Sequence, residues 1–182
     1  MKLRHLFFAC SGVFVMMFSL LLLVVIVFSD EEDGGSGGNL IYGGVSVSQE
    51  VLAHKPMLEK YAREYGIEEY LNVLLAIIQV ESGGTLEDVM QSSESLGLPP
   101  NSLSTEESIK QGCKYFSELL AAAETKGCDL NSVIQSYNYG GGFLDYVAGR
   151  GKKYTFELAE SFARDKSGGK KVTYTNPVAV EK

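Results

Sequence analysis

The chain has 182 residues, which is enough for one domain with a hydrophobic core plus an appendage. Its formal net charge of −7 at pH 7 argues against nucleic-acid binding, which requires a basic surface with interleaved aromatic residues. His54 has no second His or Cys at a metal-ligand spacing, so the sequence predicts no metal site and no cofactor.

The N-terminal segment predicts a membrane anchor. Residues 6–28 carry no charge, and at about 1.5 Å per residue a helix of this length spans a bilayer core of about 30 Å. Lys2 and Arg4 precede this run and acidic residues 30–33 follow it, so the positive-inside rule places residues 1–5 in the cytoplasm and the rest outside. A cleaved signal peptide is the alternative, but the small-residue cleavage site it requires is absent. We therefore expect a single-pass protein of the cell membrane.

The remaining chain divides into a linker, a domain and a tail. Acidic residues and glycine pairs dominate residues 29–48, and such a composition cannot bury enough apolar surface to fold, so a flexible linker is expected there. The domain is expected to cover residues 49–165, followed by a polar tail at 166–182.

Helical periodicity dominates residues 49–165. Pro56 marks the first turn of the regular part of the first helix, and Ser104 with Glu107 forms a capping box that opens the longest one. The predicted helices cover residues 51–65, 68–81, 104–126, 130–137, 143–147 and 155–164, with a loop at 137–142. No segment alternates as a strand does, so the predicted fold class is all-α, with one transmembrane helix in front of the domain.

Glu81 is the candidate catalytic residue. It lies in the last turn of an apolar helix, where the negative end of the helix dipole and the apolar neighbours both raise the pKa of a carboxyl group. A protonated Glu beside a cleft is the general acid that a glycosidase requires. The alternative is a side chain that emerges into solvent where the helix ends, and residues 71–91 alone leave both interpretations open.

Three separated motifs carry a resemblance to a known family: VESGG at 80–84, MQSSES at 90–95 and SYNYG at 136–140. Together they resemble the lysozyme-like domain of CwlT-type peptidoglycan hydrolases, which are membrane-anchored wall enzymes of Gram-positive bacteria, often encoded on conjugative elements. The wider superfamily of lytic transglycosylases and goose-type lysozymes has Gly-Leu where this chain has Asp88-Val89, and usually Ala where it has Ser136. The resemblance implies a lysozyme-like helical fold.

The resemblance also implies residue roles. Glu81 would donate a proton to the glycosidic oxygen between N-acetylmuramic acid and N-acetylglucosamine, and Tyr137 would order its carboxyl group by a hydrogen bond. The residues that the resemblance places around the sugar are Gln91, Ser92, Ser93, Tyr137 and Asn138.

Asp88 is the predicted second carboxylate. A hydrolytic glycosidase usually needs two carboxylates, whereas a lytic transglycosylase needs only Glu81, because the C6 hydroxyl of the substrate attacks. Asp88 follows the glycine break after Glu81, at a position where the CwlT-like domain also has an acid, so we expect it to be catalytic. Spacing alone leaves the adjacent Glu87 open, and Glu94 is interpreted as a residue that only holds the loop.

The expected function is that of a membrane-anchored muramidase, whose external domain opens peptidoglycan locally during conjugative transfer. Peptidoglycan strands, the membrane and the conjugation (type IV secretion) machinery are the expected partners. Two alternatives stay open: a lytic transglycosylase that leaves anhydro-muramic ends, and an inactive wall-binding or assembly module. Family members commonly continue with one more helical segment and a peptidase domain, so residues 166–182 resemble a truncated continuation.

Overall fold

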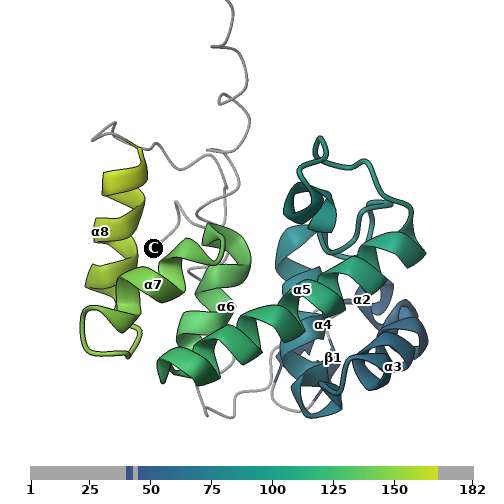
Figure 1. The fold of residues 1–182 in the computed structure, drawn as a ribbon. Helices are drawn as coiled ribbons and strands as arrows, with labels where there is room; N and C mark the ends of the chain where they lie inside the picture. Colours follow the sequence, from purple (N-terminus) through teal and green to yellow (C-terminus); the bar gives the residue numbers. More distant parts are fainter. Residues whose placement is uncertain (1–39, 43–44, 168–182) are drawn as a thin grey trace, which may run out of the picture.

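The structure is a computed structural model that describes residues 40–42 and 45–167. Its elements, with η for short 3-10 helices, are β1 (Leu40–Tyr42), β2 (Val45–Val47), α2 (Gln49–Ala53), α3 (Lys55–Glu64), η1 (Glu68–Tyr70), α4 (Leu71–Glu81), η2 (Ser92–Leu96), α5 (Thr105–Lys126), α6 (Leu130–Tyr139), α7 (Gly142–Ala148) and α8 (Phe156–Lys166). The described part of the chain is mostly helical, as the sequence predicts (Figure 1).

The predicted transmembrane helix at 6–28 lies outside the described residues, as do residues 1–5 and the tail from residue 168 on. Within residues 40–42 and 45–167, no helix combines the length and the apolar character that crossing a membrane requires.

The expectation that no segment forms a strand is wrong for the start of the described chain. β1 and β2 pair antiparallel, with Leu40 opposite Val47, and both lie within the range predicted as a linker. Strands of three residues are too short to show the alternation by which a strand is recognised in a sequence. Val47 is fully buried, and β2 packs against α4.

α4 is the central helix, and its composition explains its place. A helix that is apolar on every side has no face to turn to water and is therefore buried. Its buried residues are Val73, Leu74, Leu75, Ala76, Ile77 and Ile78. The helix ends at Glu81, as predicted, and Gly83 (φ 62°) and Gly84 (φ 78°) supply the left-handed backbone that turns the chain away.

The turn after α4 is fixed by contacts with the N-terminal helices. Gly84 lies so close to α2 that an added Cβ would come within 2.7 Å of the backbone carbon of Glu50, so a larger residue would force the two segments apart. The His54 Nε2 atom lies 2.9 Å from the Gly84 carbonyl oxygen. The Ser82 hydroxyl donates to the Val89 carbonyl oxygen at 2.7 Å. The N-terminal helices on one side and the loop at Val89 on the other therefore fix the end of α4.

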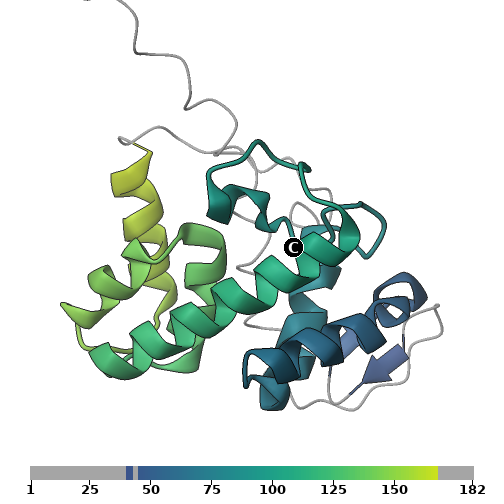
Figure 2. The ribbon, with the colours of Figure 1, turned by 45° about the vertical axis from the view of Figure 1, so that its right-hand side comes forward.

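α5 runs through the middle of the domain, with α2, α3 and α4 toward one end and α6, α7 and α8 at the other (Figures 1 and 2). The predicted capping box of Ser104 and Glu107 opens it, and Gly127 at φ 69° ends it. One hydrophobic cluster extends from β2 to α7, and a smaller one joins α7 to α8 through Phe143 and Phe162.

α6 is longer than predicted, because the expected loop at 137–142 begins only after Tyr139. The Tyr139 ring packs against Phe143 at 5.4 Å and stacks on Phe162 at 5.6 Å, between ring centroids. This packing extends the helix up to the glycines at 140–142. Tyr137 and Asn138 therefore belong to the last turn of a helix and not to a loop.

Candidate active site

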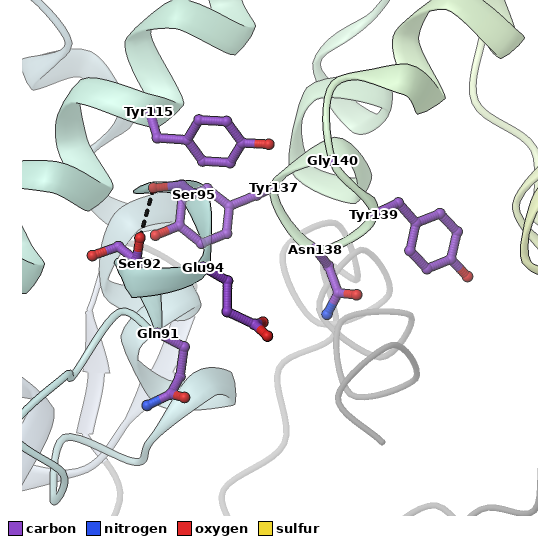
Figure 3. A pocket seen from close by; sticks show the side chains of 9 residues that line it. All are labelled: Gln91, Ser92, Glu94, Ser95, Tyr115, Tyr137, Asn138, Tyr139 and Gly140. Carbon is purple, nitrogen blue, oxygen red and sulfur yellow. Dashed lines mark hydrogen bonds between the residues drawn. The ribbon is translucent and has the colours of Figure 1, made fainter. Parts of the chain in front are cut away.

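A cavity of about 260 Å³ lies between η2, α5 and the end of α6 (Figure 3). Its size is just below the range of about 300–1,000 Å³ typical of small-molecule sites, so it suits one sugar ring better than a longer stretch of glycan. The residues that line it are Gln91, Ser92, Glu94, Ser95, Tyr115, Tyr137, Asn138, Tyr139 and Gly140. Polar groups and aromatic rings therefore share its walls, which is the composition that a sugar with polar edges and apolar faces requires.

Four of the five residues predicted to bind sugar lie on this wall: Gln91, Ser92, Tyr137 and Asn138. Ser93 does not, because it is fully buried. Two segments that are far apart in the sequence, 90–95 and 136–140, thus meet at one cavity, and Glu81 and Asp88 are not among the residues that line it.

Sequence reasoning missed Tyr115, which lies on the cavity wall and whose ring tilts against that of Tyr137, at 5.5 Å between centroids. A signal for it was present. Tyr115 is an aromatic residue of the amphipathic helix α5 that falls outside the apolar stripe of Ile109, Cys113 and Phe116. Its ring is half-buried, packs against the main hydrophobic cluster and forms part of the cavity wall.

Glu81 is half-buried at the C-terminal end of α4. Burial raises the pKa of its carboxyl group to about 8, with further contributions from the negative charges of Glu94 and Asp88. Its own charge in turn contributes to raising the pKa of Tyr137, a residue on the cavity wall, after the larger effect of burial. Glu81 is thus neither freely solvated nor remote from the cavity. It lies where a carboxylic acid stays protonated near neutral pH.

Asp88 is fully buried beneath the loop that carries η2. Its Oδ1 atom accepts hydrogen bonds from the Ser92 amide (2.9 Å) and the Ser108 hydroxyl (2.6 Å), and its Oδ2 atom accepts one from the Ser93 amide (3.2 Å). The Ser108 hydroxyl also accepts from the Met90 amide at 3.0 Å. These bonds tie the first turn of η2 to α5. The geometry gives Asp88 the contacts of a loop-organising residue, and both of its oxygens are occupied.

Gln91 has a backbone conformation that non-glycine residues rarely adopt, with φ 47° and ψ 39°. Such a conformation costs on the order of 1–3 kcal/mol and persists only where the surroundings enforce it. The side-chain amide nitrogen enforces it by donating to the Asp88 carbonyl oxygen and to Asn101 Oδ1, both at 2.8 Å. The Oε1 atom is buried and finds no hydrogen-bond partner among the residues that the structure describes.

Tyr137 is buried, and its hydroxyl donates to the Met90 carbonyl oxygen at 3.0 Å. The hydroxyl proton thus goes to Met90, whereas we had expected the bond to Glu81. Gly112 of α5 makes this contact possible, because an added Cβ would lie 2.5 Å from Met90 Sδ and 2.9 Å from the Tyr137 hydroxyl oxygen. A glycine at this position lets α6 and the 90–95 loop meet over α5.

The structure thus combines a mostly helical domain with a half-buried glutamic acid at the end of its buried central helix. The family model described as Lysozyme-like matches residues 48–182, and the chain belongs to this family. The motif-based recognition of a CwlT-type lysozyme-like domain is thereby confirmed.

Among curated proteins, the chain is similar to the bifunctional muramidase/DL-endopeptidase CwlT of Bacillus subtilis (strain 168). The two are 44% identical over 124 residues, which cover 68% of this chain and 37% of CwlT. It is also similar to the uncharacterized membrane protein YocA of the same strain, with 39% identity over 118 residues, covering 64% of this chain and 52% of YocA. The chain thus spans between about a third and a half of the length of these two relatives.

A crystal structure resembles the domain as well. It is that of a protein described as similar to lipoprotein, of the NLP/P60 family, from Staphylococcus aureus subsp. aureus Mu50. The TM-score is 0.71 and the sequence identity 73%, over 74% of this chain and 45% of the other.

Proposed function

We propose that the domain is a muramidase, which hydrolyses the bond between N-acetylmuramic acid and N-acetylglucosamine in peptidoglycan, with Glu81 as the general acid. The observation that carries the proposal is the half-buried carboxyl group of Glu81, which has a pKa of about 8 and interacts electrostatically with Glu94 and Tyr137 of the cavity wall. The name of CwlT, a muramidase/DL-endopeptidase that shares 44% of the aligned residues, supports the same activity.

The protonation state suits the role of Glu81. With a pKa of about 8, about 90% of the molecules carry the proton at pH 7, because one pH unit is a factor of ten. The glycosidic oxygen is a poor leaving group until it is protonated, and a positioned acid contributes about 10²–10⁴-fold to the rate. The rate should therefore fall as the pH rises through about 8, where Glu81 loses its proton.

We further propose that the sugar is held by Gln91, Ser92, Tyr137 and Asn138, and that Ser93 acts from beneath by fixing η2. The cavity lining supports this, because side chains of all four residues form part of the wall whereas Ser93 is fully buried.

The cellular setting is also a proposal. We propose that residues 6–28 anchor the protein in the cell membrane with the N-terminus inside, that residues 29–48 link the anchor to the domain, and that the domain opens the wall for conjugation machinery. The name of YocA, a membrane protein, supports the first part. Fractionation of cells and protease accessibility of the domain in intact protoplasts test it, and a domain protected inside protoplasts would contradict this topology.

A lytic transglycosylase is the second candidate, and one observation favours it. Both oxygens of Asp88 accept hydrogen bonds from within the protein, so the predicted second carboxylate is not free to activate water. The two reactions leave different products. Digestion of purified peptidoglycan by the full chain in detergent, followed by mass spectrometry of the muropeptides, should give reducing muramic ends, and anhydro-muramic ends would contradict the muramidase proposal.

The Glu81→Gln variant is the control for this digestion, because glutamine keeps the shape of the side chain and has no proton to donate. It should give no products of either kind. Binding of peptidoglycan without turnover by the unmodified chain would favour an inactive wall-binding module.

A further inference from the structure

We propose that the loop between α7 and α8 docks the domain onto an anionic lipid surface; this rests on the membrane anchoring proposed above. Residues 149–156, called the basic loop from here on, contain Arg150, Lys152 and Lys153 and no acidic residue. All three basic residues are exposed. Because the whole chain has a formal net charge of −7, the basic loop is a cationic surface on an acidic protein.

The cations of the basic loop are not neutralised by carboxylates around it. Within the part of the chain that the structure describes, none of the three takes part in an ion pair. The flanking acids have other partners. Asp145 pairs with Lys126 at 3.0 Å, the carboxylate of Asp129 accepts the Tyr154 amide, and Glu157 is engaged by hydrogen bonds at the start of α8. The positive charges of the basic loop are therefore available to an external anion.

Helix ends explain only part of this composition. The Arg150 Nη1 atom donates to the Tyr146 carbonyl oxygen at 3.1 Å, and its guanidinium carbon lies 3.6 Å from the centre of the Tyr146 ring, so Arg150 caps the end of α7. Phe156 has no such role, because its side chain is 50% exposed and belongs to neither hydrophobic cluster of the described residues. Basic residues beside an exposed aromatic ring are typical of surfaces that lie at a bilayer interface.

The backbone of the basic loop is fixed although its side chains reach solvent. Lys152 has a left-handed backbone, with φ 66°, which non-glycine residues rarely adopt. Its amide donates to the Val147 carbonyl oxygen at 3.0 Å, and its carbonyl oxygen accepts from the Asp129 amide at 3.2 Å. The Tyr154 amide donates to both carboxylate oxygens of Asp129 at 3.1 Å. A loop held in this way presents its cations without a large ordering cost on binding.

The basic loop and the cavity lie at opposite ends of α6. Asp129, which binds the backbone of the loop, is the N-cap of this helix, whereas residues 137–140 line the cavity at its other end. A helix of ten residues separates its two ends by about 15 Å. In Figure 1 the turn between α7 and α8 accordingly lies at the lower edge of the domain, with the end of α6 above it. A membrane contact through the basic loop thus leaves the cavity free to bind glycan.

The exposed ring of Phe156 favours a lipid surface over a soluble phosphate polymer as the partner. Such a polymer offers charges but no apolar phase for the ring, whereas a bilayer offers both. A flexible linker at residues 29–48 would keep the domain within about 25 Å of the membrane on average, so the contact forms at a high effective concentration. Each basic residue near an anionic surface strengthens binding by about fivefold, and three together by about 10²-fold.

Phe156→Trp supplies the reporter for the test, because the sequence contains no other tryptophan. The full-length variant is reconstituted into vesicles of phosphatidylcholine alone and into vesicles that also contain phosphatidylglycerol. We expect the tryptophan emission to shift to shorter wavelength, and brominated lipid chains to quench it, only in the anionic vesicles. Both effects should disappear in 1 M salt, where the Debye length falls to about 3 Å. Flotation with the neutral vesicles tests the anchor separately, since a chain that stays behind contradicts the anchoring, whereas the emission in anionic vesicles still decides on the basic loop.

Charge reversal in the reporter chain identifies the residues that bind. Lys152→Glu with Lys153→Glu should lower the ratio of quenched to unquenched tryptophan by at least about 25-fold, and Lys153→Glu alone, which leaves the fixed backbone of Lys152 untouched, by about fivefold. The matched control, Arg63→Glu with Lys114→Glu, changes the net charge equally at exposed residues of α3 and α5, and should stay within about twofold.

Two results would overturn the proposal. The first is a tryptophan that emits as in water in the anionic vesicles, or whose shift survives the reversal of Lys152 and Lys153. The second is a shift that inorganic polyphosphate causes in neutral vesicles and that anionic lipid does not cause, which would identify a phosphate polymer as the partner. The muramidase proposal stands or fails separately, because digestion of soluble peptidoglycan fragments by the same variants needs no membrane contact and should be unchanged.

Discussion

Replacing Asp88 with Asn separates a loop-organising role from a catalytic one. An asparagine keeps one acceptor oxygen, which can still serve the Ser92 amide and the Ser108 hydroxyl, but its NH₂ group then faces the Ser93 amide, donor against donor. One buried N–H without a partner costs about 1–3 kcal/mol, and the two remaining bonds lose the contribution of the charge, about 0.5–1 kcal/mol each. Removal of a buried charge offsets part of this cost.

The net expectation for Asp88→Asn is a free energy of unfolding that is lower by about 2–3 kcal/mol, which corresponds to a melting temperature lower by about 6–15 °C for a domain of this size. Thermal unfolding followed by circular dichroism measures it, with Glu87→Gln as the neighbouring control, which should unfold within about 2 °C of the unmodified chain. An Asp88→Asn variant that is as stable as the unmodified chain, yet inactive, would refute the reasoning, because it would show that Asp88 acts in the chemistry and not in the loop.

Two further changes address the acid and its support. Glu81→Gln should be more stable than the unmodified chain, and its advantage should grow as the pH rises from 4.5 to about 8, because the raised pKa makes the charged form of Glu81 costly in the folded state. The pKa difference corresponds to a gain in the free energy of unfolding of up to about 5 kcal/mol, which partial contact with solvent reduces to about 1–3 kcal/mol. Urea unfolding at pH 5 and pH 9 measures this gain. An equal gain at both pH values would mean that Glu81 is fully hydrated. The free energy of unfolding of Gly112→Ala should be lower by about 1 kcal/mol in the same urea assay, because the collision with Met90 and Tyr137 outweighs the better helix propensity of alanine. A higher free energy of unfolding would show that the neighbouring side chains move aside freely.

The helices were largely predictable, because their signals are local. Apolar periodicity, the capping box at Ser104 and the glycines after Glu81 each act within a few residues, and the structure confirms all three. The end of α6 was not predictable in this way. Tyr139 stays helical because of rings on α7 and α8, and a sequence pattern does not show which rings will meet.

The sequence predicted the part of the site that lies within the three motifs, and it did not predict Tyr115, which lies outside them. A raised pKa of Glu81 was predicted from the helix dipole and the apolar neighbours, and in the structure burial is its largest cause, followed by the charges of Glu94 and Asp88. The positions of Asp88 and Glu94 relative to the wall were not predictable, because they depend on the left-handed backbone of Gln91 and on Ser108, which lies twenty residues from Asp88 and binds its carboxylate. Spacing places both acids on one loop but does not tell which of them turns inward.

A direct titration of Glu81 tests the central claim, which is that its carboxyl group holds a proton near neutral pH. The ¹³C chemical shift of the side-chain carboxyl carbon, assigned by comparison with Glu81→Gln and followed from pH 4 to pH 10 in the full chain, gives its pKa. The account predicts a midpoint of about 8. A midpoint near the ordinary value of 4.5 would mean that Glu81 is ionised at pH 7 and would contradict its role as the proton donor.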